Sequence, residues 1–119
     1  MLTARMEGVA RKLGTPVVSF GQWTAALSEL AACRLIVVDL CLADVDITNI
    51  VERARQLPTP VPVAACGPHV HEARLAEARR AGCDVVASRG QWDHDAEKLC
   101  AELLQGSAPR GDSQSTPRP

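Results

Sequence analysis

The run LIVVD at residues 35–39 places three β-branched residues in succession between a leucine and an aspartate. An unbroken apolar run of this kind is typical of a parallel strand that helices cover on both faces, because neither face then meets water. We therefore predict a central strand here, in a layered sheet with helices above and below. This strand ends at Asp39, and ligands of such sheets bind where the parallel strands end.

Strand and helix patterns alternate on both sides of this run. Three more apolar runs predict strands, which makes four in all, at residues 16–20, 34–39, 61–66 and 84–87. Apolar residues at helical spacing predict five helices, at residues 2–13, 22–32, 46–57, 69–81 and 92–105. Strands that alternate with helices of this length indicate βαβ units. We therefore predict an α/β domain whose strands are all parallel and whose helices lie on both faces of the sheet.

The chain divides into one ordered body and a polar tail. Its 119 residues are the length of a single domain. The last segment, residues 106–119, reads GSAPRGDSQSTPRP and contains no aliphatic residue larger than alanine. Such a segment cannot bury enough apolar surface to offset the entropy that it loses on ordering. We expect one domain over residues 1–105 and a disordered tail over residues 106–119.

The composition argues against several classes of partner. The 13 basic and 14 acidic residues give a net charge of −1, which offers no electrostatic attraction to nucleic acid or to an anionic membrane surface. No apolar run is long enough for a transmembrane helix, and the N-terminal segment lacks the apolar centre of a signal peptide. We therefore expect a cytoplasmic protein. Its five cysteines form no CxxC pair and are predicted to be small buried hydrophobes.

Two longer segments resemble the receiver domains of bacterial two-component response regulators. The first, LIVVDLCLADVDITNIVERARQL, is similar to the third strand of a receiver with the loop and helix that follow it. In this segment Asp39 stands where receivers have the aspartate that accepts a phosphoryl group, and Asp46 where an aspartate often opens the helix. The second, ARRAGCDVVASRGQW, is similar to the run around the fifth strand. The resemblance spans residues 2–105 and implies a flavodoxin-like, doubly wound sheet.

The same comparison identifies where this chain departs from receivers. Receivers hold Mg²⁺ with an acidic pair that follows their first strand, whereas this chain begins in the first helix. Gly67 stands where receivers have serine or threonine, and Arg89 where they have lysine. We therefore predict a degenerate receiver with four strands and five helices and without the first strand. A gap should separate the strands at 16–20 and 34–39, unless these two strands close up and pair.

Asp39 is the first candidate for chemistry. As the phosphoacceptor position it could act as a nucleophile, with Mg²⁺ as the cofactor only if an acidic pair lay upstream of a wrongly assigned start. The alternative is a carboxylate that caps a loop or pairs with Arg89. Because no acidic pair is present to hold Mg²⁺, we predict that phosphoryl transfer is lost and that the chain needs no cofactor.

Two further groups of residues could suggest a metal or redox site. His69, His71 and Glu72 lie close together, but positions i and i+2 of a helix point in nearly opposite directions, so we predict no metal site there. Cys41 and Cys66 are expected near Asp39. A nearby cation could activate either thiol, which leaves a small α/β enzyme or thiol redox protein as an alternative.

The sequence therefore favours a binding module over an enzyme. It contains no glycine-rich phosphate loop, no Ser-His-Asp set and no pair of catalytic carboxylates. We predict a receiver-like signalling or protein-interaction module of a phosphorelay type, which binds a protein partner and neither nucleic acid nor membrane. The candidate contacts are Arg89, Gln91 and Trp92, although Trp92 could instead pack on the sheet at the start of its helix. The alternatives are a working phosphoacceptor receiver that uses Asp39, and the thiol protein described above.

Overall fold

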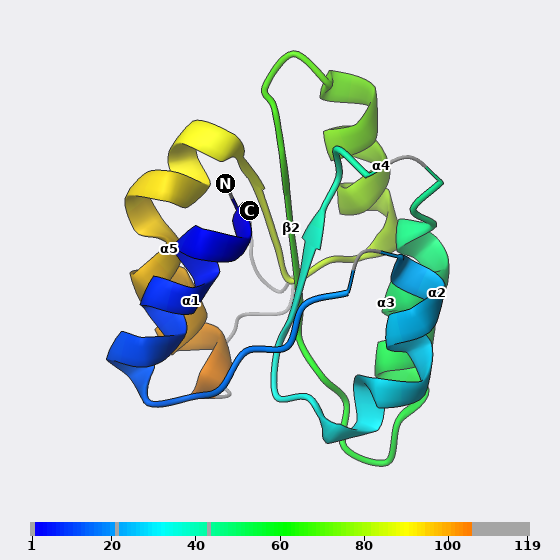
Figure 1. Ribbon diagram of the computed structural model, residues 1–119. Helices are drawn as coiled ribbons and strands as arrows, with labels where there is room; N and C mark the ends of the chain where they lie inside the picture. The colour runs from blue at the N-terminus through cyan, green and yellow to red at the C-terminus, as the bar shows by residue number, and fades with distance from the viewer. Residues whose placement is uncertain (1, 21, 43, 106–119) are drawn as a thin grey trace.

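The computed structural model describes residues 2–20, 22–42 and 44–105. Within these ranges, three parallel strands lie between two layers of helices (Figure 1). The elements in chain order are α1 (Leu2–Leu13), α2 (Trp23–Ala26), the 3-10 helix η1 (Leu27–Ala32), β1 (Ile36–Asp39), α3 (Ile47–Gln56), β2 (Val63–Gly67), α4 (Glu72–Ala81), β3 (Val85–Ser88) and α5 (Arg89–Leu104).

The sheet has the order β1-β2-β3, and both strand pairs are parallel. Across it, Val37 is level with Ala64, and Ala64 with Val85. All residues of β2 are buried, as expected of a strand covered on both faces. The prediction that residues 35–39 form a central strand is wrong for the described part of the chain. There β1 is an edge strand, because β2 is its one neighbour.

Side chains alternate along each strand between two apolar clusters, one on each face of the sheet. In β1, Ile36 and Val38 join the cluster of α3 and α4, whereas Val37, with Leu35 just before the strand, joins the cluster of α1 and α5. Figure 1 shows α1 and α5 on one side of the sheet and α2, α3 and α4 on the other. The predicted α/β architecture, with parallel strands and helices on both faces, is confirmed.

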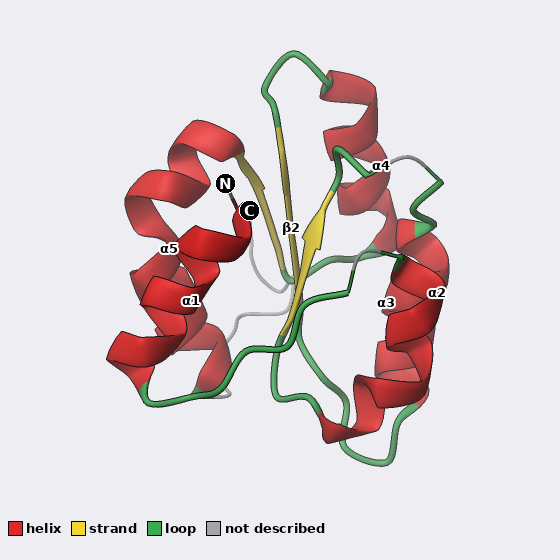
Figure 2. Ribbon diagram, viewed as in Figure 1, coloured by secondary structure: helices red, strands yellow, loops and turns green. Residues whose placement is uncertain are grey.

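Residues 15–20, which we call the crossing segment, pass from α1 on one face to α2 on the other, across the open side of β1 (Figure 2). The predicted strand at 16–20 does not form: these residues have no regular secondary structure and pair with no described strand. Pro16 has no N–H to donate, and Val17 and Val18 remain 40% and 75% exposed. The described residues therefore contain three strands, where the sequence predicts four.

Local signals mark the start of α3 and the end of α4. Asp46 opens α3 as predicted, and its Oδ1 accepts a hydrogen bond from the N–H of Asn49 at 3.1 Å. Gly82 ends α4 with a φ of 95°, in the left-handed region that favours glycine. The predicted helix at 22–32 is instead the short α2 followed by η1. Relative to the prediction, α4 begins later, at Glu72, and α5 earlier, at Arg89.

The predicted disordered tail, residues 106–119, lies outside the described residues. Among the helices of the described ranges, none is both long and apolar enough to cross a membrane.

Candidate functional site

The carboxyl ends of the three strands meet at one edge of the sheet, as they must when all strands are parallel. Asp39 ends β1 and lies level with Cys66 of β2, while Gly67 lies level with Ser88 of β3. This carboxyl edge therefore brings together an aspartate, a thiol, a glycine and a hydroxyl. Arg89 follows directly as the first residue of α5.

Asp39 uses its carboxylate to hold the loop that follows β1. Its Oδ1 accepts a hydrogen bond from the N–H of Cys41 at 2.9 Å, and its carbonyl oxygen accepts one from the N–H of Leu42 at 3.1 Å. No ion pair joins Asp39 to Arg89 within the described part of the chain. Of the two structural roles expected for Asp39, loop capping is therefore the one that the structure shows.

The thiols beside Asp39 are held in their protonated form. Cys66 is completely buried, and this burial, followed by the negative charge of Asp39, raises its pKa to about 12. The pKa of Cys41 is also raised, first by desolvation and then by the charge and the hydrogen bond of Asp39. The positive charge of Arg89 opposes both shifts without reversing them. Since the thiolate is the reactive form, this environment does not favour redox chemistry at either cysteine.

The donor atoms at the carboxyl edge do not fit the Mg²⁺ of a working receiver. Mg²⁺ requires hard oxygen ligands in a near-octahedral arrangement, whereas Asp39 has Cys66 and Gly67 as its neighbours on β2. The described residues contain no group of three or more histidine, cysteine, aspartate or glutamate side chains that could hold a metal ion. His71 is the residue before α4, and its side chain makes no capping hydrogen bond.

The three predicted partner contacts lie at the start of α5 but differ in accessibility. Ser88 begins the helix, and its Oγ accepts a hydrogen bond from the N–H of Gln91 at 3.2 Å. Gln91 is exposed and Arg89 is partly buried. Trp92 is 0% exposed and packs in the cluster that includes Cys66. Its indole is therefore not accessible as a surface anchor, and the alternative, packing on the sheet, is what the structure shows.

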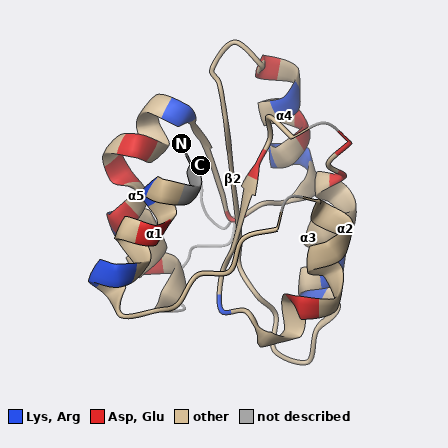
Figure 3. Cartoon of the chain, in the orientation of Figure 1, with Lys and Arg blue, Asp and Glu red and all other residues tan. Residues whose placement is uncertain are grey.

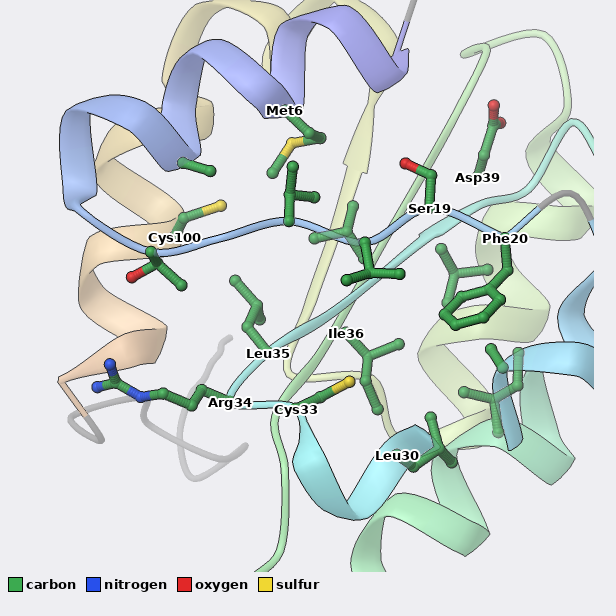
Figure 4. Close-up of a pocket in the computed structure, with 18 of the residues that line it drawn as sticks. Met6, Ser19, Phe20, Leu30, Cys33, Arg34, Leu35, Ile36, Asp39 and Cys100 are labelled. Atoms are coloured by element: carbon green, nitrogen blue, oxygen red, sulfur yellow. The ribbon is translucent and has the colours of Figure 1, made fainter. Parts of the chain in front are cut away.

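A cavity of about 650 Å³ lies between β1 and the crossing segment (Figure 4). Its lining is mainly apolar, from α1 (Met6), from η1 (Leu30) and from the β1 region (Leu35 and Ile36). A gap was predicted between two strands, at 16–20 and 34–39; the first of these does not form, and the two segments do not pair. The sequence did not predict an apolar cavity here, because its shape depends on how both helix layers pack.

Charge is distributed unevenly around this cavity. Figure 3 shows that charged residues gather on the helices, while the crossing segment carries none. Two charged residues contribute to the cavity lining, Arg34 just before β1 and Asp39 at its end. The long sides of the cavity are therefore uncharged, and its two ends carry opposite charges.

Comparison of the chain with protein-family models, with curated proteins and with solved structures finds no match, so its function is argued from the structure alone.

Proposed function

We propose that this chain is a receiver-like protein-interaction module in which Asp39 does not take part in phosphoryl transfer. The three described strands would belong to a flavodoxin-like, doubly wound arrangement. The module would act in the cytoplasm, where its five free cysteines would stay reduced.

The donor set at the carboxyl edge is the observation that carries this proposal. Transfer of a phosphoryl group to a carboxylate brings negative charges together, and a bound metal ion with a nearby cation must offset them. Asp39 is the carboxylate at the end of β1, and it already accepts the N–H of Cys41. The neighbouring positions offer a thiol and a glycine in place of oxygen ligands. Arg89, a planar guanidinium, replaces the compact ammonium of a lysine.

A phosphodonor experiment tests this part of the proposal. The full chain is incubated with acetyl phosphate and Mg²⁺, and its intact mass is compared with that of the Asp39→Asn variant. We expect no phosphoryl adduct on either protein. A stoichiometric, Mg²⁺-dependent adduct on the parent that is absent from Asp39→Asn would instead establish the phosphoacceptor function. In the same assay, amide NMR shifts around Asp39 should be unchanged by beryllofluoride with Mg²⁺.

The partner surface would consist of α4 and the start of α5. Gln91 is exposed at the start of α5, and the side chains of Arg79 and Arg80 are exposed on α4. Val70, just before α4, is 69% exposed, which is unusual for a valine in a folded domain. A partner would meet Val70 and Gln91 near the carboxyl ends of the strands, and Arg79 and Arg80 in the last turn of α4, at the other end of that helix.

Site-specific cross-linking tests the position of this surface. A photo-reactive residue is introduced at position Gln91, and a matched one at Glu52, which is exposed on α3 on another part of the molecule. In cells of the organism that encodes the chain, a discrete adduct should form from the first position and not from the second. Equal adducts from both positions, or none from the first, would contradict this surface.

A further inference from the structure

The edge of β1 that faces the cavity has unpaired backbone groups. The N–H groups of Ile36 and Leu40 donate to the carbonyl oxygens of Pro62 and Cys66, at 3.0 and 2.8 Å. Backbone groups of successive strand residues point to alternate sides, so the N–H and C=O of Val37 point away from β2. In the described residues no other strand pairs with β1. Edge groups of this kind are a template for a further strand.

The cavity lies along this same edge and continues the layering of the sheet. Leu13 and Cys100 line it from the side of α1 and α5, and Leu30 and Cys33 line it from the side of η1 (Figure 4). A group bound in the cavity would therefore have apolar side chains on both faces, as β2 has. Side chains of a bound group must therefore be apolar both where they point towards α1 and α5 and where they point towards η1.

These observations distinguish between two kinds of apolar occupant. A hydrocarbon could fill the volume, but it would leave the N–H and C=O of Val37 without hydrogen bonds, which is costly when water is excluded. An extended peptide strand would fill the volume and pair with those groups. A second copy of this chain fits less well, since its own β1 is held in a folded sheet and could not enter the space between β1 and the crossing segment as a single strand can (Figure 2).

We propose that the cavity binds one extended strand of another polypeptide, apolar along its middle, which adds to the unpaired edge of β1. Because β1 has four residues, the matching strand has four or five and spans about 15 Å. Arg34 and Asp39 lie at opposite ends of the cavity lining, so the strand carries an acidic residue at the end beside Arg34 and a basic residue at the end beside Asp39. This site differs from the surface of α4 and α5 and does not depend on the proposed function.

The first test uses two capped peptides, Glu-Val-Val-Ile-Val-Lys and its charge-reversed form Lys-Val-Val-Ile-Val-Glu, titrated into the isotope-labelled full chain. We expect one of them to bind at least about 5-fold more tightly than the other, because the two place their charges oppositely along β1. The largest amide shifts should occur at residues 15–20 and 34–39, with smaller shifts at the residues of α1, η1 and α5 that line the cavity. Hydrogen exchange at Val37 should slow at least about 10-fold on saturation, because its N–H gains a partner.

A backbone-modified peptide distinguishes a strand from an apolar ligand. The tighter peptide is N-methylated at alternate residues, which removes the N–H groups that face β1 and keeps the apolar side chains. Its affinity should fall at least about 10-fold, since those hydrogen bonds are lost. Equal affinity with unchanged exchange at Val37 would overturn strand addition in favour of apolar filling. No binding of either peptide, or self-association of the chain at this edge, would also overturn it.

Protein variants test the charge pairing without altering the core. Arg34 is exposed, so Arg34→Glu should fold normally. Because acidic groups then lie at both ends of the cavity, this variant should abolish the preference between the two peptides. Arg53→Glu, at an exposed position of α3 away from the cavity, is the matched control and should leave the preference unchanged. If Arg34→Glu also leaves the preference unchanged, the assignment of the strand ends is wrong and the proposal fails.

Discussion

Gly67, the last residue of β2, lies against Leu40 in the loop after β1. A Cβ at this position would lie 3.1 Å from the Cβ of Leu40, which is 2% exposed and has little room to move. We expect Gly67→Ala to lower the free energy of unfolding by about 1–3 kcal/mol, because the extra methyl group overpacks the core. Urea unfolding measures this change.

Gly8→Ala is the control, for which we expect the opposite change in the free energy of unfolding. It lies inside α1, and a Cβ there would meet nothing within 4 Å. Because glycine is unfavourable in a helix interior, Gly8→Ala should raise the free energy of unfolding by about 0.5–1 kcal/mol. If both alanine variants change stability in the same direction, the close approach at Gly67 is not the cause.

Asp84 makes a structural contact that the sequence did not reveal. Its Oδ2 accepts a hydrogen bond from the N–H of Val63 at 2.9 Å, and its own N–H donates to the carbonyl oxygen of Val63 at 2.8 Å. Asp84→Ala should lower the free energy of unfolding by about 1–3 kcal/mol, since a partly buried N–H loses its acceptor. The control is Glu52→Ala, on the exposed face of α3. In the same chemical denaturation experiment, it should change the free energy of unfolding by no more than about 0.5 kcal/mol. A similar loss in both variants would contradict this role.

At the scale of an element, the end of α4 depends on Gly82. Helix α4 buries only Leu75 and Ala78, so packing alone does not define where it stops. The φ of Gly82 is 95°, and Arg55 donates a side-chain hydrogen bond to its carbonyl oxygen, which joins α3 to α4. Gly82→Ala should lower the melting temperature, with a cost of about 1–2 kcal/mol for the left-handed backbone.

Gly90, near the start of α5, is the matched glycine for this test. A Cβ at Gly90 would meet nothing within 4 Å, and its φ is not in the left-handed region. The melting temperature of Gly90→Ala should therefore equal or exceed that of the parent. An equal loss of stability at both positions would show that the left-handed cap is not responsible.

The elements that the sequence predicted well are those whose environment is encoded locally. Unbroken apolar runs at 35–39 and 61–66 produce β1 and β2, because a strand buried on both faces needs apolar residues at every position. The run at 16–20 also contains adjacent β-branched residues, Val17 and Val18, yet it forms no strand. Strand formation requires a neighbour, and the strand propensity of a segment does not supply one.

The candidate site could be predicted only in part for a related reason. The end of a parallel strand locates Asp39, and the order of strands places Arg89 and Cys66 at the same edge. The sequence left two roles open for Trp92, a surface anchor or packing on the sheet, because helical spacing gives the face of an aromatic residue but not what covers it. The cavity beside β1 depends on side chains from both helix layers, and no single segment encodes it.

For the whole molecule, two buried thiols and a partly buried one make stability depend on alkaline pH. Burial raises the pKa of Cys66 and Cys83 to about 12 and that of Cys100 to about 11. In the unfolded chain these thiols ionise near pH 8.5, so above that pH the unfolded state binds fewer protons than the folded state. The free energy of unfolding should therefore fall as the pH rises from about 8.5 towards 11, by at most about 1.4 kcal/mol per pH unit for each thiol.

Urea titrations at several pH values, under reducing conditions, measure this slope. Cys66→Ala removes one of the three groups, so its free energy of unfolding should decline less steeply with pH than that of the parent, whatever its absolute stability. Identical slopes for the two proteins would show that ionisation of Cys66 is not coupled to unfolding.

The placement of the two tryptophans has an optical consequence. Trp92 is sealed in the cluster on the side of α1 and α5, whereas Trp23 packs partly buried against the opposite cluster and borders the cavity. The chain contains no tyrosine. Each face of the sheet thus has its own fluorophore. Acrylamide should quench Trp23 and spare Trp92. The red part of the emission spectrum therefore reports on the layer of Trp23, and the blue part on the layer of Trp92.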